Sequence, residues 1–318
     1  MIFIASSSLD RLTVEPVASA LKRKGADVLI YNGDDVIHGK QTMGYQLLPS
    51  GEQYIAYGKH RFSPGEIRAA WFRRPTQYRF DEPTKLQTVF LDGQRKTTQV
   101  ALWRAIPNER WLNAPGPMVQ AKDKALQLRL AHEVGLTIPK TVITNDWNTI
   151  WDTLPGDEVI LKMPYGVLYS EHKSRFLPST IVKRSDRKRL AKTNPFPGIW
   201  QEYVPKKCEW RITVVRDQVF AVAIYVDNKA RGDWRVHQFD KSLVSFKKEQ
   251  LPAHIGKASV SMLRQLNMGF GAFDIIQTPN DEFVFLEVNL DGQYQWLVDE
   301  LGLPIPEAIA DALLAIST

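Results

Sequence analysis

The pattern of apolar and polar residues is most informative near the end of the chain. Two runs rich in β-branched and aromatic residues, 273–277 and 283–289, stand on either side of a polar segment, 278–282, that contains a proline. Two such runs around a short polar connection predict a β-hairpin. Because side chains alternate between the two faces of a strand, the spacing also assigns each residue to a face.

Three side chains with oxygen atoms interrupt this apolar hairpin. Glu287 and Asn289 are two positions apart and so share a face, which Asp274 on the partner strand can reach. Two carboxylates and an amide oxygen suit a hard cation such as Mg²⁺, which prefers oxygen ligands. The alternative is a hairpin with its polar residues in solvent, which would leave Leu286 and Val288 as the only buried face.

The beginning of the chain alternates between strand and helix patterns. Residues 2–5 are apolar, 15–24 have helical spacing and end before Gly25, and 27–31 are apolar again. A strand–helix–strand opening predicts a parallel sheet. Residues 6–8 are serines where a dinucleotide-binding turn would need glycines, so no dinucleotide site is expected there.

A further strand pattern, residues 69–75, ends in Arg73 and Arg74. Sheets of α/β proteins bind ligands at such strand ends, where an arginine can meet a carboxylate or phosphate. A strand end with surface charge is an equally open alternative. Residues 84–106 then predict a helix, and the proline- and glycine-containing segment 111–117 marks a domain boundary.

The central part of the chain predicts one helix and then strands. Residues 118–134 are amphipathic at helical spacing, and the strand pattern 158–164 carries Lys162 within an apolar run. A lysine in such a run must meet an anion or extend its amine to solvent. The basic segment 183–192 is either a solvated surface or a contact for an acidic partner.

The last third predicts an antiparallel sheet and two helices. Glu209 and Arg211 share one face of a strand, so a structural ion pair between them is one interpretation of Arg211. The predicted strands are 199–204, 209–215 and 219–226, and the predicted helices are 252–267 and 305–315.

Composition narrows the possible functions. A chain of 318 residues can hold two or three domains, and 44% hydrophobic with 24% charged residues is typical of a soluble globular protein. Neither a membrane span nor a signal peptide is expected. Cys208 is the only cysteine, which excludes an internal disulfide and fits a reducing cytoplasm. The net charge of +6 admits anionic partners, but no nucleic-acid-binding motif accompanies it.

The order of these residues resembles the ATP-grasp ligases. Two lysines precede an antiparallel sheet, and the three oxygen-bearing residues follow it. The resemblance implies that Lys124 and Lys162 bind the phosphates of ATP, and that the three oxygen-bearing residues bind Mg²⁺. It also implies a hinge at adenine and an acidic ribose contact, formed by Gln201, Glu202, Tyr203 and Val204 and by Glu209.

Several separate stretches narrow the resemblance to the microviridin-type ATP-grasp peptide maturases, also called graspetide synthetases or ω-ester and ω-amide peptide macrocyclases. The chain departs from that pattern at 290–293, Leu-Asp-Gly-Gln, where the family usually has a proline, and in a glycine-poor loop after Lys162. The stretches that carry the likeness are 71–75, 111–113, 201–206, 209–215, 233–235 and 285–289.

The resemblance implies an α/β ATP-grasp fold with three domains. These are an N-terminal parallel α/β pre-ATP-grasp domain, a central domain and a C-terminal antiparallel-sheet domain with the metal site. Their expected bounds are residues 1–114, 115–199 and 200–318.

The resemblance also implies a reaction on a ribosomal precursor peptide made of a leader and a core. ATP phosphorylates an Asp or Glu side chain, and a Ser or Thr hydroxyl or a Lys amine attacks the acyl phosphate to close an ester or amide ring. Arg211 and Arg235 are the catalytic candidates, because guanidinium groups match phosphate oxygens. The basic segment 183–192 and the central domain are expected to contact the leader, and a cytoplasmic homodimer is expected.

Two other functions stay open from the sequence. One is an ATP-grasp ligase that adds a free amino acid to a peptide or protein end. The other is a protein of the same fold that binds ATP without catalysis, against which the intact lysines and metal ligands argue.

Overall fold

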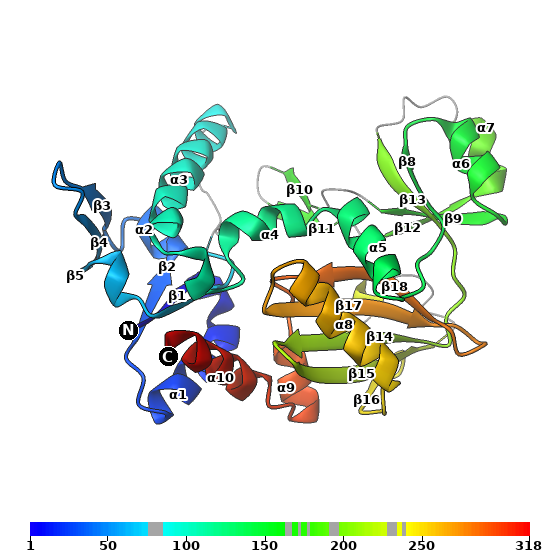
Figure 1. The fold of residues 1–318 in the computed structure, drawn as a ribbon. Helices are drawn as coiled ribbons and strands as arrows, with labels where there is room; N and C mark the ends of the chain where they lie inside the picture. The colour runs from blue at the N-terminus through cyan, green and yellow to red at the C-terminus, as the bar shows by residue number, and fades with distance from the viewer. Residues whose placement is uncertain are drawn as a thin grey trace.

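The computed structural model describes residues 1–75, 85–162, 167–170, 173–176, 179–190, 197–227, 234–236 and 240–318. Figure 1 shows the N-terminal part on the left, with a small central sheet at the upper right and a larger C-terminal sheet below it. The glycine-poor loop after Lys162, Asp233, and residues 191–192 of the basic segment lie outside the described residues.

The N-terminal sheet is parallel throughout, as the strand–helix–strand opening predicts. Its strand order is β2-β1-β6-β7, and α1 (Arg11–Arg23) connects its first two strands. Val14, Val17 and Leu21 of α1 are buried at helical spacing. The strands are β1 (Ile2–Ser6), β2 (Val28–Asn32), β6 (Ala69–Phe72) and β7 (Trp111–Leu112).

An aromatic cluster covers the other face of this sheet. Phe3 contacts Tyr31, Trp103 and Trp111, with ring centroids 6.0, 6.3 and 6.4 Å away. Trp103 comes from the long helix α3, which ends as the apolar pattern predicts. The other elements of this part are α2 (Gly33–Ile37), the antiparallel strands β3 (Met43–Leu47), β4 (Gln53–Tyr57) and β5 (His60–Phe62), and α3 (Lys85–Ala105).

The single helix predicted over residues 118–134 is wrong, because two helices, α4 (Pro115–Ala121) and α5 (Lys124–Glu133), occupy this segment. Asp123 separates them in an extended conformation and accepts a hydrogen bond from Leu126 N at 2.7 Å. Aspartate is a strong N-cap residue, since its carboxylate satisfies a free amide at a helix start. The break therefore begins α5 with Lys124.

The central sheet has the order β12-β9-β13-β8 and is antiparallel. Ile150 and Trp151 of α6 pack against Trp200 in its small core. Its elements are β8 (Thr141–Thr144), α6 (Trp147–Thr153), β9 (Glu158–Lys162), β12 (Thr180–Lys183), α7 (Arg187–Leu190) and β13 (Gly198–Glu202), and the hairpin strands β10 (Val167–Ser170) and β11 (Lys173–Phe176) lie nearby in sequence.

The C-terminal sheet contains the predicted hairpin and has the antiparallel order β16-β15-β14-β17-β18. Helix α8 packs on it through Ile255, Met262 and Leu263, as its apolar spacing predicts. The elements are β14 (Cys208–Val215), β15 (Gln218–Val226), β16 (Val244–Lys247), α8 (Ala253–Gln265), β17 (Phe270–Gln277), β18 (Phe283–Asn289), α9 (Gln295–Leu301) and α10 (Ile305–Ser317).

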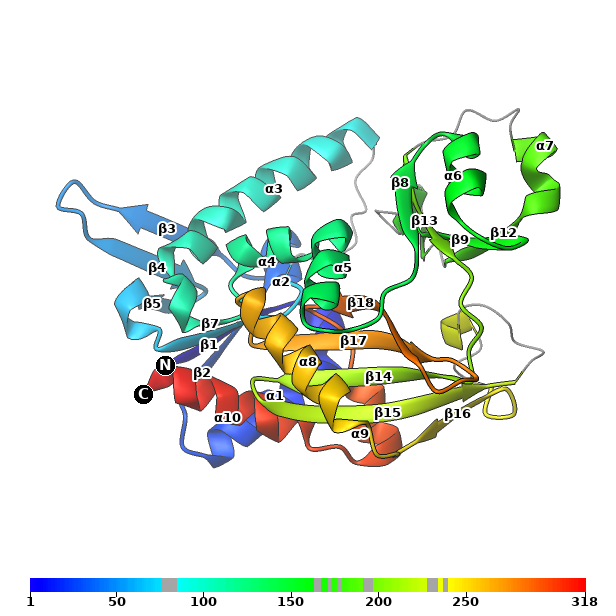
Figure 2. The same cartoon turned by 45° about the vertical axis from the view of Figure 1, so that its right-hand side comes forward.

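The last helix returns to the beginning of the chain. In Figure 2 the red helix α10 runs below the blue strands of the N-terminal sheet. Ile309 and Leu313 of α10 are fully buried in one core with Val17 and Leu21 of α1. The final residues therefore complete the core on one face of the N-terminal sheet, while the three domain boundaries stay predictions.

Among the described residues, the structure holds no helix whose length and apolar character would let it cross a lipid bilayer.

We expect Leu313→Ala to lower the free energy of unfolding by about 3 kcal/mol, because it leaves a cavity in this shared core. Leu12→Ala is the matched control, since Leu12 on α1 is 78% exposed. Urea denaturation of the two variants measures the difference. Equal midpoints for both would show that α10 does not stabilise the N-terminal core.

Candidate active site

A row of charged side chains crosses three strands of the C-terminal sheet. Arg211 on β14 is the cross-strand partner of Asp274 on β17, and Asp274 is the partner of Glu287 on β18. Residues directly opposite one another on one face lie close enough for their side chains to meet. The sheet itself therefore brings a guanidinium and two carboxylates together.

A β-bulge in β18 sets which residue stands opposite Asp274. Ile275 pairs with Phe285, whereas the preceding residue, Asp274, pairs with Glu287, so Leu286 is the extra residue. Without the bulge, Leu286 would take the position opposite Asp274. Bulges are frequent beside functional sites because they redirect a side chain. Here the bulge directs Glu287 to the face of Asp274.

The three predicted oxygen-bearing residues share this face. Asn289 Nδ2 donates to Glu287 Oε1 at 2.9 Å and to Asp274 Oδ2 at 3.2 Å. The side chains of Asp274 and Glu287 are only 19% and 21% exposed. The solvent-facing alternative is therefore wrong, and the opposite face buries Phe285 together with Val288.

Lysines from two other elements surround Glu287. Lys124, the first residue of α5, places Nζ 2.6 Å from Glu287 Oε2. Lys162, the last residue of β9, also acts electrostatically on Glu287. Burial alone would raise the pKa of Glu287, but the two lysines outweigh it and lower this pKa well below its usual range. Glu287 is therefore a carboxylate at neutral pH.

Burial sets the direction of the pKa shift at Asp274 and at Lys162. Burial raises the pKa of Asp274, and the nearby guanidinium of Arg211 offsets only part of this rise. Burial also lowers the pKa of Lys162, although Glu287 opposes that change. Both groups thus lack the solvation that would favour their charged forms. A bound cation would favour the charged form of Asp274, and a bound anion would favour that of Lys162.

Arg211 does not form the ion pair with Glu209 that the sequence left open as an alternative. Its Nη1 lies 2.6 Å from Asp274 Oδ1, and its Nη2 donates to the carbonyl of Gln293 at 3.0 Å. Glu209 instead forms an ion pair with Lys206, three residues earlier. The structural interpretation of Arg211 as a Glu209 partner is therefore wrong.

The predicted hinge, residues 201–204, leads from the central sheet to the C-terminal sheet. Gln201 is buried and donates to Thr141 Oγ1 at 3.0 Å, and Glu202 accepts a hydrogen bond from Lys140 N at 2.7 Å. The last two hinge residues are half-buried. Both polar side chains are thus engaged with the start of β8 and the residue before it.

Arg235 lies in a short turn of residues 234–236 and is exposed. Its charge acts on both Asp274 and Lys162, lowering the pKa of each. The turn therefore brings this second catalytic candidate within electrostatic range of the charged row.

Residues to which the sequence assigned no role hold the site in place. Gln127 on α5 brackets Val288, with Nε2 donating to its carbonyl at 3.0 Å and Oε1 accepting from its amide at 3.2 Å. Asp291, two residues beyond β18, forms an ion pair with Lys122 at 2.9 Å. Two features of the sequence could have indicated these roles: a glutamine on the apolar side of a predicted helix, and an aspartate shortly after the strand that carries Glu287 and Asn289.

The donor set fits Mg²⁺. Two carboxylates and an amide are hard oxygen-bearing ligands, and Mg²⁺ commonly binds through one or two carboxylates while substrate phosphates complete its shell. Within the described part of the chain, no group of three or more His, Cys, Asp and Glu side chains could hold a metal without such help. The site suits a cation that arrives with a phosphate ligand.

Comparison with known proteins gives no matching family model and no matching curated protein. Among solved structures, a RiPP-associated ATP-grasp ligase of Chryseobacterium gregarium, in complex with ADP and a leader and core peptide, has 24% identity and a TM-score of 0.85. The similarity covers 99% of this chain and 96% of that one. The chain has the ATP-grasp fold.

Two further solved structures are similar over nearly the whole chain. The macrocyclase MdnB of Microcystis aeruginosa MRC is 28% identical, with a TM-score of 0.79 and 98% of both chains covered. The ATP-grasp ligase PsnB, complexed with minimal precursor, Mg and ADP, is 17% identical, with a TM-score of 0.74 over 100% of this chain and 97% of that one. The predicted ATP-grasp fold is confirmed, whereas the microviridin type stays a prediction.

We expect Glu287→Gln to lower the pKa of Lys162 further, because the substitution removes the carboxylate that most favours the charged amine. An NMR titration of the lysine Cε resonances measures this pKa, with Lys162→Met to assign the signal. Glu282→Gln, at an exposed position in the same hairpin, should leave it unchanged. An unaltered Lys162 pKa in Glu287→Gln would show that the two groups are not coupled.

Proposed function

We propose that this protein is an ATP-dependent peptide ligase that activates Asp or Glu side chains of a precursor peptide and closes ester or amide rings with Ser, Thr or Lys side chains. One observation carries the proposal. Two lysines and an arginine from three different elements converge on the cross-strand pair of Asp274 and Glu287. The ADP and peptide complexes of the similar ligases support the nucleotide and the substrate class.

The charge balance of the site favours a polyanion. Lys124, Lys162 and Arg211 surround two carboxylates, and the charge of Arg235 also reaches Asp274. Cations therefore outnumber anions in a half-buried place, which favours binding of a triphosphate. We assign the phosphates to Lys124 and Lys162, adenine to residues 201–204 and ribose to Glu209.

Asp274, Glu287 and Asn289 would hold Mg²⁺. When bound, this ion would neutralise charge on the phosphate oxygens that react. The side chains of the protein would orient the reacting groups. The carboxylate of the peptide is a poor electrophile until it is phosphorylated, and Arg211 would hold the oxygens of the transferred phosphate in a fixed bidentate orientation. Arg235 would approach the same oxygens from its exposed turn.

The peptide would extend beyond this site. The described part of the segment 183–192 offers exposed Lys183, Lys188 and Arg189, whereas Arg184 is held by the carbonyls of Trp151 and Gly156. We therefore propose the three exposed cations as contacts for an acidic leader. A homodimer in the cytoplasm and a microviridin-type product belong to the same proposal.

The alternative within the same fold is a ligase that adds a free amino acid to a peptide or protein end. The two reactions differ in product mass. A macrocyclase product loses one water per ring and needs no second substrate, whereas a tailing ligase adds the mass of each residue.

Glu287→Ala should abolish ATP-dependent dehydration of the precursor peptide, because it removes a ligand of the cation and the partner of Lys124. Mass spectrometry of the peptide measures dehydration, and circular dichroism checks that the variant is folded. Glu282→Ala in the turn of the same hairpin is the matched control and should retain activity. Full activity of Glu287→Ala would refute the metal assignment.

Lys162→Ala should weaken nucleotide binding by about 100-fold or more, because a charge-assisted contact to phosphate is lost in a poorly solvated place. Isothermal titration calorimetry with a non-hydrolysable ATP analogue gives the affinity. Lys257→Ala, on the exposed side of α8, should bind as the wild type does. Equal affinity in Lys162→Ala would count against the phosphate role.

A further inference from the structure

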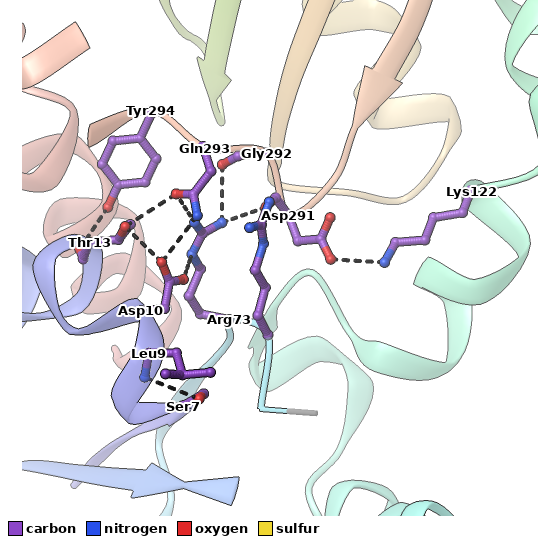
Figure 3. A network of polar contacts seen from close by, with 11 residues as sticks. Ser7, Leu9, Asp10, Thr13, Arg73, Lys122, Asp291, Gly292, Gln293 and Tyr294 are labelled. Carbon is purple, nitrogen blue, oxygen red and sulfur yellow. Dashed lines mark hydrogen bonds and ion pairs between the residues drawn. The ribbon is translucent and has the colours of Figure 1, made fainter. Parts of the chain in front are cut away.

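A short loop directly after β18 lies between the N-terminal sheet and Arg211. The loop, residues 291–293, is part of the segment in which the chain departs from the family pattern. Figure 3 shows Arg73 reaching it from the end of β6, with its guanidinium between Asp10 and the side chain of Gln293. This arrangement connects the N-terminal part of the molecule to the charged row.

Arg73 is buried, with 1% of its side chain exposed, and its donors are directed at the loop. Nη1 donates to the carbonyls of Asp291 and Gly292 at 2.5 and 3.0 Å, and Nη2 donates to Gln293 Oε1 at 2.6 Å. Its Nε lies 2.6 Å from Asp10 Oδ2, and the side chain of Asp10 is 4% exposed. A buried guanidinium with this many fixed partners holds the loop in one conformation.

The other side of the same loop contacts Arg211. The carbonyl of Gln293 accepts from Arg211 Nη2 at 3.0 Å. A Cβ atom at Gly292 would stand 2.9 Å from that Nη2 and 2.6 Å from the Cβ of Ala272, so the backbone approaches Arg211 too closely for a side chain. The loop therefore sets where Nη2 of Arg211 lies, independently of its pairing with Asp274.

Two residues of the N-terminal part strengthen this hold. Asn113 Nδ2 donates to the carbonyls of Leu290 and Phe270, both at 2.8 Å, so it fixes the loop start next to the first residue of β17. Arg74 Nε donates to the carbonyl of Asp291 at 3.0 Å. Both have a positive φ, 61° for Asn113 and 51° for Arg74, a conformation that is uncommon outside glycine. Such strained positions cluster at functional sites.

We propose that Arg73 and Gln293 are positioning residues for the reaction, because they fix the loop that orients the Arg211 guanidinium. The inference rests on the proposed function, in which Arg211 holds the transferred phosphate. Arg73 reaches neither carboxylate of the charged row and acts only through residues 291–293. We expect its effect on the chemical step, because Arg73 bonds the backbone of Asp291 and not the carboxylate that pairs with Lys122 before α5, and the lysines assigned to nucleotide lie on α5 and β9.

A double-mutant cycle tests this role. Arg73→Lys keeps the charge but loses the forked donor set, and it should lower kcat for peptide dehydration by about 10- to 100-fold with nucleotide affinity within about twofold. In an Arg211→Lys background the same substitution should cost less than about twofold, because residues that act as one unit are not additive. Dehydration rates at saturating ATP and peptide, and calorimetry for affinity, supply the values.

A matched control separates positioning from general stabilisation. Arg110 also holds a loop of the N-terminal part, donating to the carbonyls of Pro64, Gly65 and Ile67, but it lies outside the network around Arg211. Arg110→Lys should leave kcat within about twofold even where it lowers the melting temperature. Gln293→Met, which keeps Arg73, replaces Arg73→Lys in the cycle if the latter does not fold.

The outcomes distinguish positioning of Arg211 from general stabilisation of the fold. Equal proportional losses in the wild-type and Arg211→Lys backgrounds would overturn the positioning role, as would wild-type kcat in both Arg73→Lys and Gln293→Met. A wild-type protein that binds nucleotide but never dehydrates a precursor peptide would instead refute the proposed function itself.

Discussion

The cross-strand pair of Asp274 and Glu287 is the constraint on which the rest of the site depends. Two carboxylates directly opposite each other in a half-buried sheet repel, and each loses solvation. The fold offsets this cost with cations from three separate places, Lys124 on α5, Lys162 on β9 and Arg211 on β14. The electrostatics of one pair thereby ties the central sheet, the linking helix and the C-terminal sheet together.

The offset is uneven, and this unevenness suits the proposed chemistry. Glu287 has two lysines and a lowered pKa, whereas Asp274 has Arg211 and a raised pKa. One carboxylate is therefore fixed in its charged form, and the other gains most from an additional cation. A bound metal ion would stabilise the charged form of Asp274. The phosphate that comes with it would neutralise the excess positive charge of the lysines.

The sequence predicted elements and faces better than it predicted partners. Period-two spacing placed Glu287 and Asn289 together, because that rule is local to one strand. The bulge at Leu286 changes which residue faces Asp274, yet an apolar residue there fits a regular strand equally well. Likewise, Arg211 had a near neighbour of opposite charge in sequence, whereas its actual partner comes from a strand about 60 residues later.

Contacts between distant segments make the N-terminal part structurally continuous with the C-terminal part of the chain. The last helix completes the core beside α1, and the loop after β18 is held by Arg73 and Asn113 from the N-terminal sheet. Neither contact follows from periodicity, because each depends on closure of the chain over more than 150 residues. The two arginines at the end of β6 had two open interpretations, ligand contact or surface charge. Surface charge is wrong for Arg73, since it is buried and ion-paired with Asp10 while it fixes the backbone against which Arg211 lies, and a ligand contact at this strand end stays a prediction.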